Sequence, residues 1–162
     1  MTIKFRECTK EDFISFKTMM SSLDSSHKKF SSSIKNVIDN ERYIELFYKA
    51  LNSVNFFLTF AEQNNEIIGF SYSKINHIKN SYLFKDCSIG EIQYLYIQKE
   101  HRLNQIGRLL LEKTELSLKE QNVSEIRLRV YSSNNESFPE KANYEEDYKV
   151  FRKKTIANTV YN

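Results

Sequence analysis

The stretch Glu91–Leu111, EIQYLYIQKEHRLNQIGRLLL, joins an aromatic-rich segment to a leucine-rich one through a basic loop. Residues 89–98 are rich in β-branched and aromatic side chains and predict a β-strand. Residues 105–121 repeat apolar side chains at helical spacing and predict a helix. The stretch therefore predicts a strand–loop–helix junction, around which the other elements are arranged.

The start of this helix has the properties of an anion site. The first amides of a helix lack partners within the helix, and the helix dipole favours negative charge beside them. No proline lies between residues 98 and 113, so every backbone N–H is available there, and Arg102 and Arg108 add positive charge. A pyrophosphate fits this environment without a metal. In the alternative interpretation, Gly107 only lets the helix pack closely against the sheet, and both arginines are solvated.

The segments around the junction predict a mixed α+β domain. Thr9 is the predicted N-cap of a helix, with Asp12 at the spacing of a capping box. The Ser-rich residues 24–33 predict a loop, either a plain connection or a substrate lid. Consecutive strands joined by short turns favour antiparallel pairing, and the strand–helix–strand unit over residues 89–131 favours one parallel pair. The remaining strands are predicted at residues 2–7, 55–62, 66–78 and 144–152, a hairpin turn at 63–65, and the remaining helices at 10–23, 34–51 and 134–142.

The composition limits the function classes. The chain has 162 residues, which predicts one domain over residues 1–154 and a C-terminal tail over residues 155–162. Its 24 basic and 21 acidic residues nearly balance, so neither a nucleic acid nor a membrane is an expected partner. The two isolated cysteines and three scattered histidines favour free thiols and no metal site. Without a secretory signal pattern at its N-terminus, the protein is expected in the cytoplasm.

The junction and the order of elements resemble the GNAT superfamily of acyl-CoA-dependent N-acyltransferases over nearly the whole chain. The family's cofactor motif is Gln/Arg-x-x-Gly-x-Gly/Ala, and Arg102-Leu103-Asn104-Gln105-Ile106-Gly107 matches its first and last positions. The strand Glu91–Ile97 is similar to that of bacterial members, including polyamine-type acetyltransferases. Residues 107–111 fit the family's G-x-x-L-L helix, and FPEKANY at residues 138–144 stands at the place of F-Y-E-K-x-G-F.

The resemblance implies both an architecture and a cosubstrate. It implies a central, mostly antiparallel twisted sheet with a splayed parallel pair, flanked by helices. Acetyl-CoA would insert between the strands 91–98 and 125–131, with no metal, and donate its acetyl group to a primary amine. A small amine or polyamine is slightly favoured as the acceptor, and the protein is expected to be a monomer or homodimer. The implied cofactor-binding residues are Leu95, Tyr96, Ile97, Arg102, Leu103, Asn104, Gln105, Ile106, Gly107, Arg108 and Asn134.

For catalysis, the resemblance and the chemistry together point to one carboxylate. Glu91 is the expected base that takes the proton of the acceptor amine, directly or through water. Strict alternation would place Glu91, Gln93 and Leu95 on one face of the strand, and Tyr94 and Tyr96 on the other.

Two positions depart from the family pattern. Gln105 has a side chain where the family usually has glycine, and Pro139 replaces the tyrosine that protonates the leaving thiolate. These departures leave open a second hypothesis, in which the chain is a degenerate member that binds acyl-CoA or serves as an interaction domain.

Overall fold

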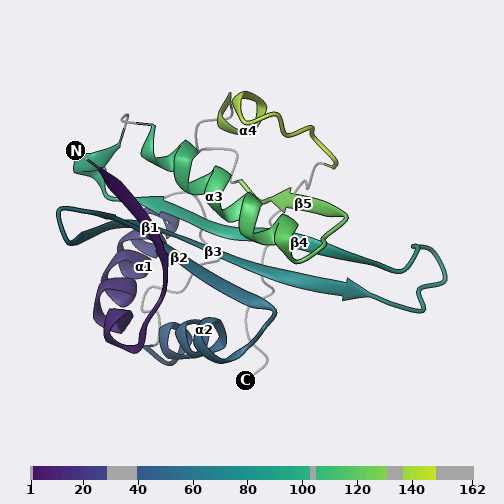
Figure 1. The fold of residues 1–162 in the computed structure, drawn as a ribbon, viewed down its shortest axis with the longest axis horizontal. Coiled ribbons are helices and arrows are strands. Elements are labelled where there is room, and N and C mark those ends of the chain that lie inside the picture. Colours follow the sequence, from purple (N-terminus) through teal and green to yellow (C-terminus); the bar gives the residue numbers. More distant parts are fainter. Residues whose placement is uncertain (1, 29–39, 103–104, 131–136, 149–162) are drawn as a thin grey trace, which may run out of the picture.

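The structure is a computed structural model that describes residues 2–28, 40–102, 105–130 and 137–148. A single five-stranded sheet of strand order β1-β2-β3-β4-β5 forms its centre (Figure 1). The first three pairings are antiparallel and the β4–β5 pairing is parallel, which confirms the predicted fold class. The strands are β1 (Ile3–Glu7), β2 (Phe56–Gln63), β3 (Glu66–Ile78), β4 (Cys87–Ile97) and β5 (Glu125–Leu128).

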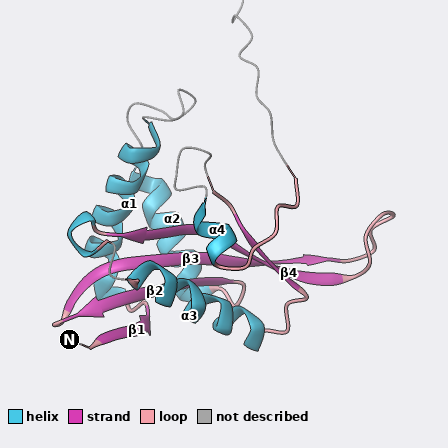
Figure 2. Ribbon diagram, turned by 90° about the horizontal axis from the view of Figure 1, so that it is seen from above, coloured by secondary structure: helices cyan, strands magenta, loops and turns pink. Residues whose placement is uncertain are grey.

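Helices cover both faces of the sheet. The helices α1 and α2 lie on one face, and α3 with the short α4 lies on the other (Figures 1 and 2). On the first face, the aromatic residues Phe16, Phe47, Phe70 and Tyr72 form the centre of the core, all at most 1% exposed. On the second, α3 packs Leu110 and its neighbours against the sheet. The helices are α1 (Phe13–Lys28), α2 (Asn40–Asn52), α3 (Ile106–Glu120) and α4 (Ser137–Lys141), with 3₁₀ turns at Lys10–Asp12 and Lys99–His101.

The β2–β3 hairpin confirms the predicted turn. Asn64 and Asn65 form its two-residue loop with φ of 52° and 65°. Positive φ at both central residues is the geometry that matches the twist of the two strands, and asparagine tolerates it better than most residues.

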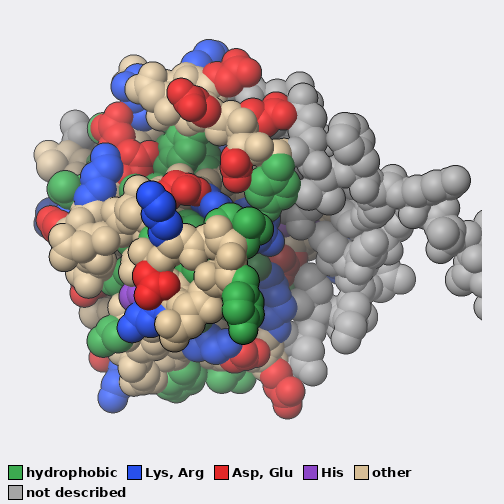
Figure 3. Space-filling view, turned by 90° about the vertical axis from the view of Figure 1, so that its right-hand side faces the viewer, with side chains coloured by type: hydrophobic (Ala, Val, Ile, Leu, Met, Phe, Trp, Pro, Cys, Tyr) green, Lys and Arg blue, Asp and Glu red, His purple; other side chains and the backbone are tan. Residues whose placement is uncertain are grey.

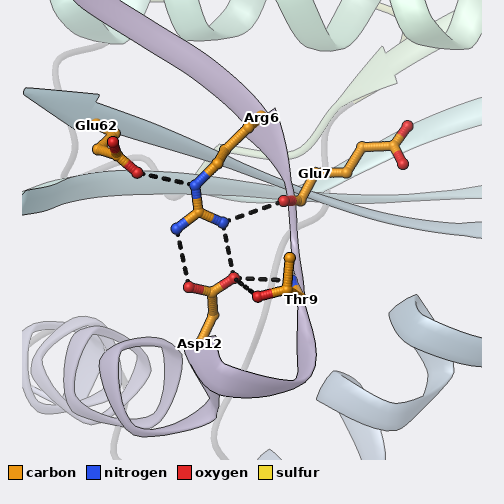
Figure 4. A network of polar contacts seen from close by, with 5 residues as sticks. All are labelled: Arg6, Glu7, Thr9, Asp12 and Glu62. Carbon is orange, nitrogen blue, oxygen red and sulfur yellow. Dashed lines mark hydrogen bonds and ion pairs between the residues drawn. The ribbon is translucent and has the colours of Figure 1, made fainter. Parts of the chain in front are cut away.

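The polar start of the chain ties β1 to the first helix (Figure 4). Arg6 donates two hydrogen bonds to Asp12, at 2.7 and 2.9 Å, and a third to Glu62 at 2.8 Å. Asp12 also accepts the backbone N–H of Thr9 at 2.7 Å, which is the predicted capping contact. The Arg6 hydrogen bonds outweigh burial, and they lower the pKa of the Asp12 carboxyl.

Three predicted boundaries are wrong. Residues 24–28 are not a loop but continue α1, because Asp24 and His27 are buried and the serines bond to helix carbonyls; residues 29–33 lie outside the described residues. The strand predicted at residues 125–131 ends at Leu128. Residues 144–148 are not a strand, and the rest of that predicted strand lies outside the described residues.

The tip of the β3–β4 hairpin projects from the body of the protein (Figures 1 and 2). Its residues Tyr82, Leu83 and Phe84 are all more than half exposed. Figure 3 looks onto the end of the molecule from which the hairpin projects and shows hydrophobic side chains interspersed with charged ones there.

Candidate functional site

The strand β4 changes its pairing halfway along its length. Its first half, Ile89–Ile92, pairs with β3 on one edge and with β5 on the other. The register with β3 then shifts, so that Gln93 is an extra residue between the paired positions Ile92 and Tyr94. The bulge coincides with the last paired residue of β5, Leu128. Beyond the bulge, β4 pairs with β3 alone, which matches the splayed pair that the family resemblance implies.

Backbone amides therefore face an open edge of β4. The N–H of Gln98 donates to Ile68 of β3 at 2.9 Å. Because successive residues of a strand direct their N–H groups to opposite edges, the N–H groups of Leu95 and Ile97 are directed away from β3. No described strand pairs with β4 at that edge beyond Leu128. Of the predicted cofactor-binding residues of this strand, Leu95 and Ile97 thus direct their N–H groups into the opening, whereas the N–H of Tyr96 is directed to β3.

The helix α3 begins close to this edge. Its N-cap, Gln105, has φ 59° and ψ 3°, a left-handed conformation that glycine adopts more readily. This is the position at which the family usually has glycine. A Cβ built on Gly107 would lie 3.8 Å from Ile97 Cγ1, an ordinary contact. Close packing against the sheet therefore does not require a glycine at position 107.

The two arginines of the junction have different surroundings. Arg102 folds back onto β4, where its Nε donates to the carbonyl of Ile97 at 2.9 Å and its guanidinium lies 5.7 Å from the ring of Tyr96. Arg108 lies on the surface of α3 and bonds Glu112 at 2.9 Å. The structure brings Arg102 to the open edge and places Arg108 on the first turn of the helix.

The carboxylate of Glu91 lies among cations, and the residue is only 8% exposed. Its Oε2 is 3.4 Å from Lys74 Nζ and accepts a hydrogen bond from Asn76 at 3.2 Å. Its Oε1 is 2.6 Å from Arg129 Nη2, an ion pair without hydrogen-bond geometry, so this buried oxygen has no aligned donor among the described residues. Lys74, Asn76 and Arg129 therefore hold the Glu91 side chain in place from both sides.

The predicted alternation of side chains along β4 is wrong at the bulge. Tyr96 belongs to the core beneath α1 and α2, and Tyr94 packs against that core. Leu95 and Ile97 contact the clusters beneath α3. Glu91 pairs with Lys74 of β3, two residues along from Tyr72 of the α1–α2 face. Because Gln93 inserts one extra residue, Glu91 shares this face with both tyrosines.

A second polar cluster on the same face links both helices to β4. Arg42 of α2 donates to Asp24 of α1 at 2.5 Å and to the hydroxyl of Tyr94 at 3.0 Å. Tyr43 also donates to Asp24, at 3.1 Å, and Asp24 is 5% exposed. This cluster was not predicted, because nothing in the spacing of these residues shows that α1 and α2 meet over Tyr94.

A cavity of about 570 Å³ opens between α1 and the end of β4. Five hydroxyl side chains of α1 line one wall: Thr18, Ser21, Ser22, Ser25 and Ser26. The other wall is formed by residues 96–100, immediately before the predicted cofactor loop. The cavity was not predicted, because residues 24–28 were assigned to a loop.

The C-terminal elements place no phenol at position 139. Pro139 lies in α4, and the next tyrosine, Tyr144, donates to Glu115 of α3 at 2.8 Å. Burial raises the pKa of Tyr144 well above its ordinary value, which makes this hydroxyl a poor proton donor. The predicted binding residues Leu103, Asn104 and Asn134 lie outside the described residues.

Within the described part of the chain, no group of three or more His, Cys, Asp or Glu could hold a metal ion. Over the same residues, no helix combines the length and apolar character needed to cross a membrane. Both cysteines are free, and burial raises the pKa of Cys8 to about 11.

Comparisons with known proteins give the family and the fold. Residues 20–142 match the model of the acetyltransferase (GNAT) family. No curated protein matched the sequence. A mutant of the BH1408 protein from Bacillus halodurans has a TM-score of 0.83 at 18% identity, over 94% of this chain and 99% of that one.

Two further structures carry acetyl-CoA or an analogue of it. A predicted acetyltransferase from Clostridium acetobutylicum, solved with acetyl-CoA, has a TM-score of 0.77 at 18% identity, over 94% of this chain and 96% of that one. AAC(6')-Iy, solved with the bisubstrate analogue CoA-S-monomethyl-acetylneamine, has a TM-score of 0.77 at 11% identity, over 97% and 100% of the two chains. At these identities the likeness shows a shared fold.

Proposed function

The chain belongs to the acetyltransferase (GNAT) family, and from this premise we propose that it transfers the acetyl group of acetyl-CoA to the nitrogen of a primary amine. The reaction would be a direct attack of the amine on the thioester, with a small amine or polyamine as the acceptor. No metal takes part in this proposal.

One observation carries the proposal. The N–H groups of Leu95 and Ile97 are directed to an edge of β4 that β5 leaves open beyond Leu128, and the first turn of α3 follows a few residues later. Donors fixed at the position of a developing oxyanion stabilise it without reorganising. Free amides at a helix start suit the pyrophosphate of the same cosubstrate. The space beside Gly107 supports this assignment, since packing against the sheet does not require a glycine there.

The proposed reaction forms one bond, breaks another and releases one proton. The amine nitrogen forms a bond to the thioester carbon, the carbon–sulfur bond breaks, and the sulfur leaves with the bonding electrons as CoA thiolate. The attacking nitrogen loses one proton, which we assign to Glu91, directly or through a water. A free primary amine with a pKa near 10.4 is neutral in about one molecule in 2,500 at pH 7, equivalent to about 4.6 kcal/mol. Removing this proton from the amine is therefore a larger obstacle than protonating the leaving thiolate.

The contacts of Glu91 Oε1 bear on this role in two opposite ways. Its Oε1 is buried without an aligned donor among the described residues, which favours a further hydrogen bond to this oxygen. The same oxygen lies 2.6 Å from Arg129 Nη2, so an incoming N–H would have to displace this guanidinium or reach the carboxylate through a water. A water relay to an outer acceptor is consistent with both.

The absence of a tyrosine at position 139 affects this mechanism less than the proton of the amine does. The leaving group is a thiol with a pKa of about 8.5, only about 1.5 units above neutrality. Its departure as a thiolate therefore needs little help from an acid.

The alternative is a degenerate member that binds acyl-CoA without transferring the acyl group. The observation that favours it is the absence of a phenol at position 139. Release of free thiol from acetyl-CoA, measured with a panel of amines, separates the two functions. Amine-dependent release supports the transferase, and CoA-dependent stabilisation without release supports the binding domain.

The base is tested through the pH dependence of kcat/KM. We expect Glu91→Gln to lower kcat/KM by about 10²-fold or more and to flatten the acidic limb of the profile, because that limb reports ionisation of the base. Glu125→Gln is the matched control, since it makes the same chemical change at a carboxylate that bonds Arg127 and not the neighbours of Glu91. An acidic limb that is unaltered in Glu91→Gln removes Glu91 from this role.

A further inference from the structure

A serine, a histidine and an asparagine are joined by hydrogen bonds near the base of the β3–β4 hairpin tip. The hydroxyl oxygen of Ser88 in β4 lies 2.8 Å from Nδ1 of His77 in β3. Nε2 of the same ring lies 3.1 Å from Oδ1 of Asn55, the residue directly before β2. The order Ser–His–Asn is that of a nucleophile, a base and a group that orients the base.

The contact with Asn55 determines which nitrogen of His77 carries the hydrogen. A carbonyl oxygen only accepts hydrogen bonds, so Nε2 of His77 donates to Asn55 Oδ1 and the neutral ring has its lone pair on Nδ1. The hydroxyl of Ser88 therefore donates to Nδ1. The imidazole is thus already placed to take the hydroxyl proton when the serine attacks an electrophile.

Backbone hydrogen bonds hold this arrangement in place. His77 and Ser88 are direct partners in the antiparallel β3–β4 ladder. On the other edge of β4, the carbonyl of Ser88 accepts the N–H of Ser124 at 2.8 Å and the hydroxyl of Ser124 at 3.0 Å. The carbonyl of Asn55 accepts the N–H of Ile75 at 2.8 Å. Groups carried by paired strands keep their geometry better than groups on loops, so the Ser–His contact is part of the sheet.

The serine is accessible and lies away from the edge assigned to acetyl-CoA. His77 is exposed and Ser88 is half-buried, so a small electrophile reaches the hydroxyl from solvent. Along β4, Ser88 precedes Leu95 by seven residues, or roughly 20 Å at about 3.3 Å per residue. A reagent at Ser88 therefore leaves the open half of β4 unoccupied.

We propose that Ser88 is a nucleophile that accepts the acyl group of small aryl esters, with His77 as its base and Asn55 as the residue that positions the base. An aryl ester suits this pair, because a phenol, with a pKa near 10, leaves more easily than an alkyl alcohol. This acyl-accepting site goes beyond the proposed acetyltransferase and needs neither CoA nor Glu91.

The proposed step transfers one acyl group and one proton. The Oγ of Ser88 forms a bond to the ester carbonyl carbon, and its proton passes to Nδ1 of His77. The bond between the carbonyl carbon and the phenol oxygen then breaks. The phenol leaves with the bonding electrons and takes the proton from His77, and the acyl group stays on Ser88.

The test incubates the full chain, without CoA, with p-nitrophenyl acetate and locates the acetyl group by peptide mass spectrometry. We expect acetylation of Ser88 that is at least about 100-fold slower in His77→Gln, because a placed general base contributes about 10²–10⁴-fold. His101→Gln is the matched control, since it makes the same change at the histidine of the 3₁₀ turn after β4 and should keep the rate. Acetylation confined to other residues overturns the inference, and so does an undiminished rate in His77→Gln.

Two serine variants check the assignment of the label. Ser88→Ala should remove the acetyl group from its peptide. Ser117→Ala is the matched control, because this hydroxyl bonds a carbonyl of its own helix at 3.2 Å, and the variant should be acetylated at Ser88 like the wild type. Faster or equal acetylation of the Ser88 peptide in Ser88→Ala would show that another side chain is the nucleophile, which overturns the inference.

Variants of Asn55 distinguish a positioning role from a structural link between the strands. Asn55→Ala should slow the acetylation of Ser88 about tenfold, since either nitrogen of His77 can then carry the hydrogen, whereas Asn55→Asp keeps an acceptor oxygen and should retain the rate. An unaltered rate in Asn55→Ala, with or without a lower Tm, overturns the positioning role. Stabilisation of each variant by CoA is measured separately, and this result bears on the proposed function alone.

Discussion

The two halves of β4 have a similar composition but differ in how they are paired. The half from Ile89 to Ile92 is paired on both edges, and Ile92 is fully buried beneath α3. The half from Tyr94 to Ile97 is paired on one edge, and its other edge leaves the amides of Leu95 and Ile97 to a ligand. A single extra residue, Gln93, separates them. The comparison teaches that the bulge coincides with the change from a strand paired on both edges to one with an open edge, and that it also places Glu91 on the face of Tyr94 and Tyr96.

The largest expected effect contrasts Gly69 of β3, which lies opposite the open half, with Gly90 in the paired half. A Cβ on Gly69, opposite Ile97, would lie 2.6 Å from the backbone oxygen of Tyr96, whereas a Cβ on Gly90 would lie 3.0 Å from the flexible end of Leu118. We expect Gly69→Ala to lower the free energy of unfolding by about 3 kcal/mol, and Gly90→Ala by less than about 1 kcal/mol. Urea denaturation of both variants measures the difference. Equal losses would contradict the rigid backbone contact in the open half.

The next effect tests the ligand assigned to the open half. Gly107→Glu should weaken CoA binding about 100-fold, or about 2.7 kcal/mol, because it sets a carboxylate beside the pyrophosphate. Gly107→Ala is the control, since its Cβ would make only an ordinary contact with Ile97. Calorimetric titration with CoA measures both. Undiminished affinity in Gly107→Glu would remove the start of α3 from the cofactor site.

The contacts of Asp12 lie away from both halves of β4, so they provide a test of stability that should not involve CoA. Asp12→Ala breaks the bonds with Arg6 and Thr9, and should cost about 2 kcal/mol of stability at pH 7 without changing CoA affinity. The pKa of the Asp12 carboxyl is lowered in the folded protein, so its contribution is present above the unfolded value near 3.9 and is lost as the pH falls through the folded value. Unfolding curves from pH 7 to pH 3 follow it: the gap between wild type and variant should narrow in acid. A gap that stays constant would contradict the linkage.

The smallest effect concerns the N-cap of α3. Gln105 adopts φ 59° without the freedom of glycine. Gln105→Gly should raise stability by about 1 kcal/mol through relief of left-handed strain, less some loss to the greater entropy of the unfolded chain. Thermal unfolding checks the change, with Asn122→Gly as the comparison, since Asn122 has φ 56° at the other end of the same helix and asparagine tolerates this conformation better. A lower Tm for Gln105→Gly would show that the side chain at position 105 makes a stabilising contact.

Much of the architecture was predictable from local pattern. The bounds of β3 agree with the prediction. Those of β1, β2 and α3 differ from the predicted bounds by at most one residue at each end. Apolar periodicity and the asparagine turn are local properties, which a sequence shows directly. With three glycines in the chain, asparagine and Gln105 take the left-handed positions, so glycine spacing alone underestimates the turns.

The site was less predictable, for physical reasons. A bulge depends on the register between two strands, so the face of Glu91 could not be read from alternation. The partners of Glu91 lie on either side of β4: Lys74 in β3 and Arg129 directly after β5. Asp24 meets Arg42 only through helix packing. The serines of α1 appeared loop-like because their hydroxyls favour turns; here they bond to helix carbonyls instead.

The most direct test follows the backbone amides of β4 themselves. Amide hydrogen exchange, read residue by residue by NMR with and without saturating CoA, compares the two halves within one experiment. The account predicts that CoA slows the exchange of Leu95 and Ile97 by at least tenfold and leaves Gly90 and Ile92 unchanged. Unaltered exchange at Leu95 and Ile97 while CoA is bound would contradict the claim that the open half of β4 holds the acyl-CoA.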